Sequence, residues 1–199
     1  MYIRQEEYMY DKSREAIIAK YTDKSRYRPQ YIFGDVYVDE ERITLSESNT
    51  VEKEKFETEL NTAKRFSDKF GFAIFMLPPK DGNKNIYVDK GSNPDTISFE
   101  MFVEIKNPSG TGTSIKTRFR ESVHKADGVL LSVEKNISVS QVKKWIEDQL
   151  HWMNNHDGFL VAIEVGAENN RKYGVFKING KELSLGSFPE KPRLSSPLI

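Results

Sequence analysis

Apolar residues recur at intervals of three and four positions between residues 51 and 70, and this is the clearest periodic pattern in the chain. The recurring positions are Phe56, Leu60, Ala63, Phe66 and Phe70. They lie on one face of an α-helix, so the pattern predicts a long amphipathic helix over residues 51–70. Gly71 follows where a left-handed cap commonly ends a helix. Similar patterns predict helices over residues 6–21, 114–126 and 139–153.

Continuous or alternating apolar stretches predict the strands. In chain order the main predicted strands cover residues 72–77, 96–99, 102–107, 128–134, 158–165 and 172–178. We expect a tight bend at residues 100–101 between the second and third of these, and a hairpin formed by the last two. A further hairpin-like stretch covers residues 31–45 and turns around residues 39–41.

Helices and strands alternate, which predicts an α/β or α+β fold with a mixed central sheet and flanking helices. Over residues 51–134 the expected order is helix, strand, strand, strand, helix, strand. Three parts follow from the pattern: an N-terminal accessory segment (residues 1–50), a main domain (residues 51–185) and a C-terminal tail (residues 186–199). The tail holds three prolines and little periodicity, so we expect no regular element there.

Composition excludes several kinds of site. The chain has 199 residues, with 30 basic and 30 acidic side chains, so no global field favours a nucleic-acid or membrane partner. With no cysteine and three scattered histidines, disulfides, thiolate chemistry and Cys/His zinc sites are excluded. The first residues lack the apolar core of a signal peptide, and no apolar run reaches the length of a membrane span. We therefore expect a cytoplasmic protein without a membrane partner.

The strongest chemical signal lies between residues 93 and 106. Pro94 and Asp95 open this stretch, and Glu104 and Lys106 close it two residues apart in a predicted strand, so both side chains share a face. Asp95 and Glu104 carry the hard oxygen ligands that bind magnesium, and Lys106 can orient a water molecule or stabilise a negatively charged phosphate. The alternative is an edge strand with a surface Glu/Lys pair, which contributes little energy.

Glu59 is a further candidate from the predicted helix over residues 51–70. On a helical wheel it borders the apolar stripe, so its carboxylate can face a neighbouring sheet. The alternative is an ordinary carboxylate at the rim of the core.

A local positive surface follows the acidic strand. The predicted helix over residues 114–126 carries Ser114, Lys116, Arg118 and Arg120, which are candidates for contacts with backbone phosphates. An ordinary solvated face is the alternative. The glycine loop over residues 108–113 lacks the Gly-Lys-Ser part of a phosphate-binding loop, which makes nucleoside triphosphate binding unexpected.

Together these features resemble the PD-(D/E)XK nucleases. Pro94 and Asp95 with Glu104, Ile105 and Lys106 are similar to that superfamily's motif, and the expected order of elements is that of its core. The resemblance implies that Asp95 and Glu104 bind Mg²⁺ or Mn²⁺, that Lys106 positions the attacking water and that Glu59 joins the metal ligands. The main domain would then be a nuclease domain that acts on DNA or RNA.

Residues 54–134 also resemble the C-terminal nuclease domains of contact-dependent inhibition toxins and of related phage and mobile-element proteins. Such toxins imply an immunity protein as a possible partner. Some of them belong with the barnase, EndoU, colicin and RelE type of RNase, which cleave RNA without metal. Under that alternative Lys106, Ser114, Arg118 and His124 would matter more than Asp95. A third possibility is a non-catalytic module that binds nucleic acid or protein on the same fold.

Overall fold

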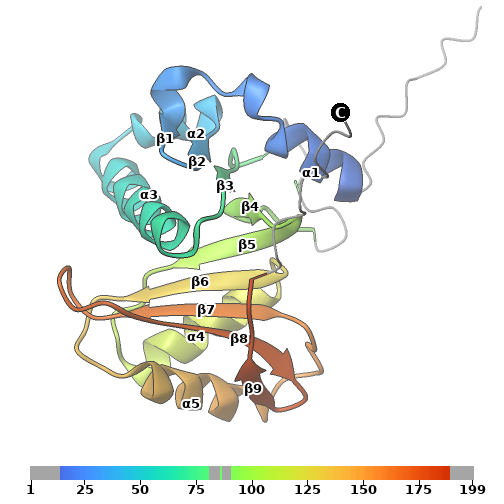
Figure 1. Ribbon diagram of the computed structural model, residues 1–199, viewed down its shortest axis with the longest axis vertical. Helices are drawn as coiled ribbons and strands as arrows, with labels where there is room; N and C mark the ends of the chain where they lie inside the picture. Colours follow the sequence, from blue (N-terminus) through green and yellow to red (C-terminus); the bar gives the residue numbers. More distant parts are fainter. Residues whose placement is uncertain (1–13, 81–85, 87–90, 189–199) are drawn as a thin grey trace, which may run out of the picture.

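The computed structural model describes residues 14–80, 86 and 91–188 (Figure 1). Within these residues the chain forms one nine-stranded mixed sheet with five α-helices, so the predicted fold class is confirmed at this level. The strands lie side by side in chain order, from β1 at one edge to β9 at the other. The strands are β1 (Ile32–Phe33), β2 (Val36–Val38), β3 (Ile74–Met76), β4 (Thr96–Ser98), β5 (Met101–Lys106), β6 (Gly128–Val133), β7 (Leu160–Val165), β8 (Lys172–Asn179) and β9 (Glu182–Leu185).

The α-helices connect or flank these strands. They are α1 (Arg14–Thr22), α2 (Glu40–Ser46), α3 (Thr50–Phe70), α4 (Gly112–Val123) and α5 (Val139–Leu150). Strand β2 is parallel to β3, β5 to β6 and β6 to β7, and the remaining neighbours are antiparallel. Each parallel pair is joined through one or two helices, as parallel strands require. No described helix has the length and apolar character needed to cross a lipid bilayer.

Helix α3 begins and ends as its sequence predicts. The side chain of Asn49 accepts a hydrogen bond from the amide of Glu52 and caps the first turn, and Gly71 has φ 68° and a left-handed conformation after the last turn. The buried face of α3 includes Ala63 and Phe66, which pack on the sheet with Ile105 of β5.

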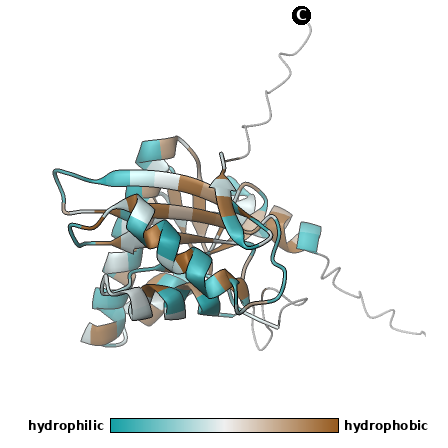
Figure 2. Cartoon of the chain, turned by 90° about the horizontal axis from the view of Figure 1, so that it is seen from below, coloured by the Kyte–Doolittle hydropathy of each residue, from teal (hydrophilic) through white to brown (hydrophobic). Residues whose placement is uncertain are grey.

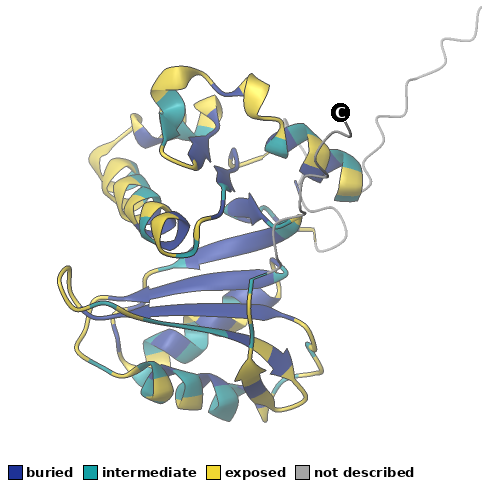
Figure 3. Cartoon of the chain, in the orientation of Figure 1, coloured by how far each residue is buried: buried dark blue, intermediate teal, exposed yellow. Residues whose placement is uncertain are grey.

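The opposite face of the sheet is covered by α4 and α5 (Figure 1). Ile115 of α4 and Ile146 of α5 pack there against Leu131 of β6 and Ile163 of β7. Central strands β5 to β7 are therefore enclosed on both sides, and Figure 3 shows them almost wholly buried. Figure 2 shows the same layering as hydrophobic strands between helices with hydrophilic outer surfaces.

The N-terminal segment differs from its prediction. The hairpin predicted over residues 31–45 turns at Gly34 and Asp35, between β1 and β2, and not around residues 39–41. Asp39 instead caps α2, because its side chain accepts a hydrogen bond from the amide of Glu41. Strand β2 pairs with β3, so the first fifty residues contribute two strands to the common sheet.

Smaller differences concern the ends of elements. The turn between β4 and β5 is formed by Phe99 and Glu100, one residue earlier than predicted. Helix α4 begins within the glycine loop because the Thr111 side chain caps it. The strand β9 was not predicted, since the alternation of its four residues is too short to detect. The predicted start of the first helix and most of residues 186–199 lie outside the described residues.

Candidate functional site

Asp95, Glu104 and Lys106 meet where β4 and β5 lie side by side. Glu104 and Lys106 are two residues apart on β5, so strand alternation directs both side chains to one face. The antiparallel register that pairs Thr96 with Val103 brings Asp95, which precedes β4, alongside Glu104. The ammonium of Lys106 contacts Glu104 Oε2 and lies 3.7 Å from Asp95 Oδ2. The structure thus brings these three predicted residues together.

Backbone hydrogen bonds hold Asp95 in place. Its Oδ2 atom accepts a hydrogen bond of 2.9 Å from the amide of Ile105, and its carbonyl oxygen accepts one of 2.9 Å from the amide of Leu77. The first bond ties the side chain to β5, and the second ties the backbone to the end of β3. The carboxylate of Asp95 therefore has a defined orientation toward Glu104 and Lys106.

Glu104 is the most deeply buried member of the cluster, with 1% of its surface exposed. Neither of its carboxylate oxygens accepts a hydrogen bond of normal geometry from a described residue, although Oε2 is in ion-pair contact with Lys106. Burial raises the pKa of Glu104, and the nearby Asp95 carboxylate raises it further, while Lys106 opposes both effects. Burial alone would lower the pKa of Lys106, but the Asp95 and Glu104 carboxylates raise it on balance.

Arg42 of α2 joins the cluster from the N-terminal segment. Its guanidinium donates a hydrogen bond of 2.5 Å to Glu59 Oε2 and lies 3.6 Å from Asp95 Oδ1. It also donates to the carbonyl oxygens of Leu77 at 3.0 Å and of Asp95 at 3.3 Å. Burial raises the pKa of Glu59, with Arg42 opposing the shift. Glu59 is thus buried beside the cluster, and its carboxylate is paired with an arginine.

Two hollows border the cluster. A cavity of about 210 Å³ lies on the Asp95 side, where Arg42, Glu59, Asp95 and Lys125 line it. A second cavity of about 380 Å³ lies on the Lys106 side and is lined by Glu59, Lys106 and Arg118, among others. A small charged group can therefore reach Asp95 from one side and Lys106 from the other.

The donor set fits a magnesium or manganese ion through two of the three predicted ligands. Magnesium commonly binds one or two protein carboxylates and keeps several water molecules. Asp95 and Glu104 supply two adjacent carboxylates, and Oε1 of Glu104 has no hydrogen-bond partner among the described residues, whereas Oε2 contacts Lys106. Glu59 fits less well because Arg42 occupies its carboxylate. Across residues 14–80, 86 and 91–188, no three Asp, Glu, His or Cys side chains form a group that could hold a metal.

The predicted phosphate-binding residues of α4 have different surroundings. Lys116 is paired with Asp148 of α5 at 3.3 Å, and Arg118 is paired with Glu121 at 2.9 Å. Arg120 is exposed. At the start of the helix the hydroxyl of Ser114 accepts a hydrogen bond from the amide of Ser109. Only Arg118 also lines the cavity beside Lys106.

Sequence reasoning missed Arg42. The pattern Asp39-Glu40-Glu41 is a helix-start signal and places Arg42 in the first turn of a helix. No local pattern, however, indicates that this turn lies against the ends of β3 and β4. Lys125, which follows α4, also lines the cavity beside Asp95.

The fold and this cluster define a mixed α/β protein with a partly enclosed Asp/Glu/Lys site on neighbouring strands. Comparison of the chain with protein-family models, with curated proteins and with solved structures gives no match. The evidence for its function therefore comes from the geometry of the site.

Proposed function

We propose that the chain is a nuclease that hydrolyses phosphodiester bonds with the help of Mg²⁺ or Mn²⁺, on a domain similar to the PD-(D/E)XK nucleases. The observation that carries this proposal is the convergence of Asp95, Glu104 and Lys106 at a point where the carboxylate of Glu104 is buried. Burial of a carboxylate is costly even when a cation is paired with it, and strongly perturbed buried carboxylates occur often at sites that bind or react.

The order of the elements supports the comparison with that superfamily. Helix α3, strands β3, β4 and β5, helix α4 and strand β6 follow one another, which is the order of the PD-(D/E)XK core. Asp95 precedes β4 and Lys106 ends β5, in agreement with the positions of the family's motif.

Each residue has a defined task in this proposal. Asp95 and Glu104 would hold the cation, which supplies Lewis acidity toward the phosphate when it is bound. Lys106 lies beside both carboxylates at the mouth of a cavity, where its ammonium can orient the attacking water and stabilise negative charge on the phosphate. Arg42 would position Asp95 through its contacts with both the side chain and the backbone. Arg118, in the same cavity as Lys106, would contact a backbone phosphate.

A metal-independent RNase is the second candidate, and one observation favours it. Lys106 and Arg118 line one cavity, so two cations could stabilise a pentavalent phosphate without a metal. In that case the carboxylate of Asp95 would serve only to orient Lys106.

A cleavage assay separates the candidates. Labelled DNA and labelled tRNA are incubated with the protein in manganese or in chelator, and the variants Asp95→Asn, Glu104→Gln and Lys106→Ala are compared with the surface variants Glu57→Gln and Lys144→Ala. A metal-dependent nuclease requires that each site variant, and chelator in the wild type, abolish cleavage while the surface variants cleave normally.

Other outcomes contradict the proposal in different ways. Cleavage of RNA alone that continues in chelator and survives Asp95→Asn would exclude the metal-dependent mechanism and support the RNase. A folded protein that cleaves neither substrate under any condition would point to a non-catalytic binding module.

A further inference from the structure

A second buried charge cluster lies on the α3 side of the sheet, away from Asp95. Glu164 of β7 has no exposed surface, and its carboxylate accepts hydrogen bonds from Arg65 Nε at 2.9 and 3.1 Å and from the hydroxyl of Ser132 at 3.0 Å. Arg171, which precedes β8, also pairs with Glu164. The two guanidiniums are therefore fixed from within the protein.

This arrangement leaves guanidinium donors directed away from Glu164. Arg65 uses Nε toward Glu164 and Nη2 toward Thr62 and Ser132, while its Nη1 has no hydrogen-bond partner among the described residues. Arg171 uses Nη1 toward Glu164, and its Nη2 has only a long contact of 3.5 Å with the exposed Glu134. Rigid guanidiniums bind phosphate with little loss of side-chain freedom.

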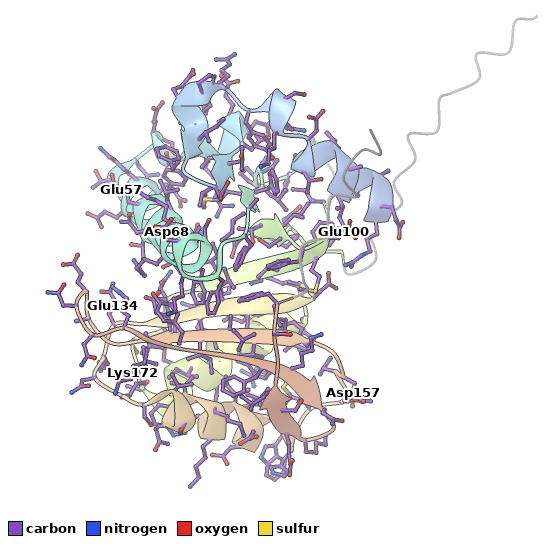
Figure 4. The ribbon with its side chains drawn as sticks, in the orientation of Figure 1. Glu57, Asp68, Glu100, Glu134, Asp157 and Lys172 are labelled. Carbon is purple, nitrogen blue, oxygen red and sulfur yellow. The ribbon has the colours of Figure 1, made fainter. Side chains whose placement is uncertain are left out.

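Both arginines line a groove of about 860 Å³, which we call the α3 groove. It runs between α3 and the segments that follow β6 and β7, and Figure 4 shows two of its lining residues, Asp68 of α3 and Glu134, on the same side of the molecule. Its cationic lining consists of Lys64, Arg65, Lys69 and Arg171, and its acidic lining consists of Asp68, Glu134 and Glu168.

The α3 groove continues into the cavity beside Lys106. Thr58 lines both of them. One turn further along α3, Thr62 donates a hydrogen bond of 2.8 Å to the side chain of Asn107, the residue after Lys106, and accepts one from Arg65. Hydrogen bonds through the buried Thr62 thus link Arg65 with the residue that follows Lys106.

We infer that the α3 groove binds the sugar-phosphate backbone of the nucleic-acid strand beyond the point of cleavage. This inference rests on the proposed function. Arg65 and Arg171 would hold one phosphate, and the exposed Lys64 and Lys69 would neutralise its neighbours. The acidic residues in the lining keep the groove close to neutral, so the fixed guanidiniums determine where the strand lies more than how tightly it binds.

The geometry sets a minimum length for the ligand. From Glu59 to Lys69 the helix α3 rises about 15 Å. In a duplex the phosphates of one strand advance about 3.4 Å per nucleotide along the helix axis, so a duplex aligned with α3 needs roughly four to five phosphates of one strand to reach from the cleavage site to the far end of the groove. A trinucleotide at the cleavage site cannot contact the whole groove.

The test compares the binding of a DNA trinucleotide and a DNA dodecamer by fluorescence anisotropy, in chelator to prevent metal-dependent cleavage. The double variant Lys64→Gln/Lys69→Gln removes the two exposed cations, and Lys144→Gln/Lys177→Gln removes two exposed cations that do not line the groove. For the dodecamer the slope of log affinity against log salt should fall by about two in the groove variant and stay unchanged in the control. The wild type should therefore lose roughly tenfold more affinity than the groove variant between about 50 and about 200 mM salt.

Removal of a negative charge from the groove gives a second test. Glu168→Gln removes an exposed acidic residue from the same lining and should tighten binding of the dodecamer, with little effect on the trinucleotide. If the wild type prefers the dodecamer but the groove variant binds it with the same affinity and the same salt slope, the α3 groove does not bind the strand. The proposed nuclease function would be unaffected by that result. Absence of wild-type binding to DNA and to uncleavable 2′-O-methyl RNA would overturn both.

Discussion

Glu104 shows how a single residue can be kept at the expense of stability. Its carboxylate is buried between strands, close to Asp95, and its oxygens lack hydrogen bonds from the described residues. The pKa of Glu104 is raised chiefly by burial, so the folded protein favours the protonated form more than the unfolded chain does. A residue with these properties destabilises the native state at neutral pH.

We therefore predict that Glu104→Gln stabilises the metal-free protein. The pKa of Glu104 is higher in the folded protein than in the unfolded chain, so the wild type should lose stability as the pH rises above the ordinary glutamate value of 4.5. The Gln variant has no carboxylate at this position, so it should not show this loss. At pH 7 the free energy of unfolding should therefore be higher in the variant than in the wild type. Urea denaturation in chelator at several pH values measures this, and a less stable variant at neutral pH would show that Lys106 compensates the buried charge fully.

Arg42 illustrates the reverse situation, in which one residue compensates several others. Arg42→Met would leave Glu59 buried without its cation and would free the loop that carries Asp95. Loss of one partner of a buried ion pair typically costs about 3 kcal/mol, so we expect a decrease of that order in the free energy of unfolding. Arg28→Met removes an exposed arginine paired with Glu40 on the same segment and should change stability by less than about 1 kcal/mol. Equal effects of the two substitutions would contradict the central role of Arg42.

At the level of elements, the hairpin between β4 and β5 has an unusual turn. Phe99 and Glu100 have φ values of 52° and 58°, in the left-handed region that favours glycine and asparagine. The turn has two residues, because Ser98 pairs directly with Met101. Phe99 is retained by packing: its ring lies 4.6 Å from that of Phe72. Glu100 is exposed, so its side chain offers no such compensation.

Glu100→Gly should therefore stabilise the protein by about 0.5 to 1 kcal/mol, since glycine adopts this conformation without strain. Glu182→Gly on the edge strand β9 provides the matched control, because there an extended glutamate is replaced and stability should decrease by a similar amount. Thermal unfolding of both variants measures the difference. Destabilisation by both would mean that the turn is not strained enough to matter.

At the level of the whole molecule, the charge cluster joins three parts of the chain that are distant in sequence. Arg42 comes from α2, Glu59 from α3, and Asp95, Glu104 and Lys106 from the β4–β5 hairpin. Cations and carboxylates alternate around the cluster, so a change at one member alters the electrostatic surroundings of the others. A ligand that binds Asp95 and Glu104 in the native state should consequently stabilise the entire protein.

Magnesium or manganese is the ligand we expect to act in this way. Millimolar Mg²⁺ or Mn²⁺ should raise the melting temperature of the wild type, and Asp95→Ala should remove that increase because one of the two adjacent carboxylates is lost. Asp148→Ala removes an exposed carboxylate on α5 and should leave the increase intact. Differential scanning fluorimetry with and without chelator measures these shifts. An equal shift in Asp95→Ala would place the metal elsewhere.

The sequence by itself determined the main elements and one feature of the site. The periodicity of residues 51–70 and the caps at Asn49 and Gly71 specify α3, because amphipathic spacing and capping are local properties. The two-residue spacing of Glu104 and Lys106 likewise specifies a shared face, since alternation along a strand does not depend on the rest of the fold.

Only the tertiary structure decided what surrounds these residues. Whether Glu59 faces another carboxylate or an arginine depends on where α2 packs, and the contact of Arg42 with Asp95 spans more than fifty positions of sequence. The same holds for Arg65 and Glu164, which come from α3 and β7 and meet only after the sheet has formed. Such contacts depend on strand order and helix placement, which are set by the burial of the whole core and leave no periodic signal in either segment.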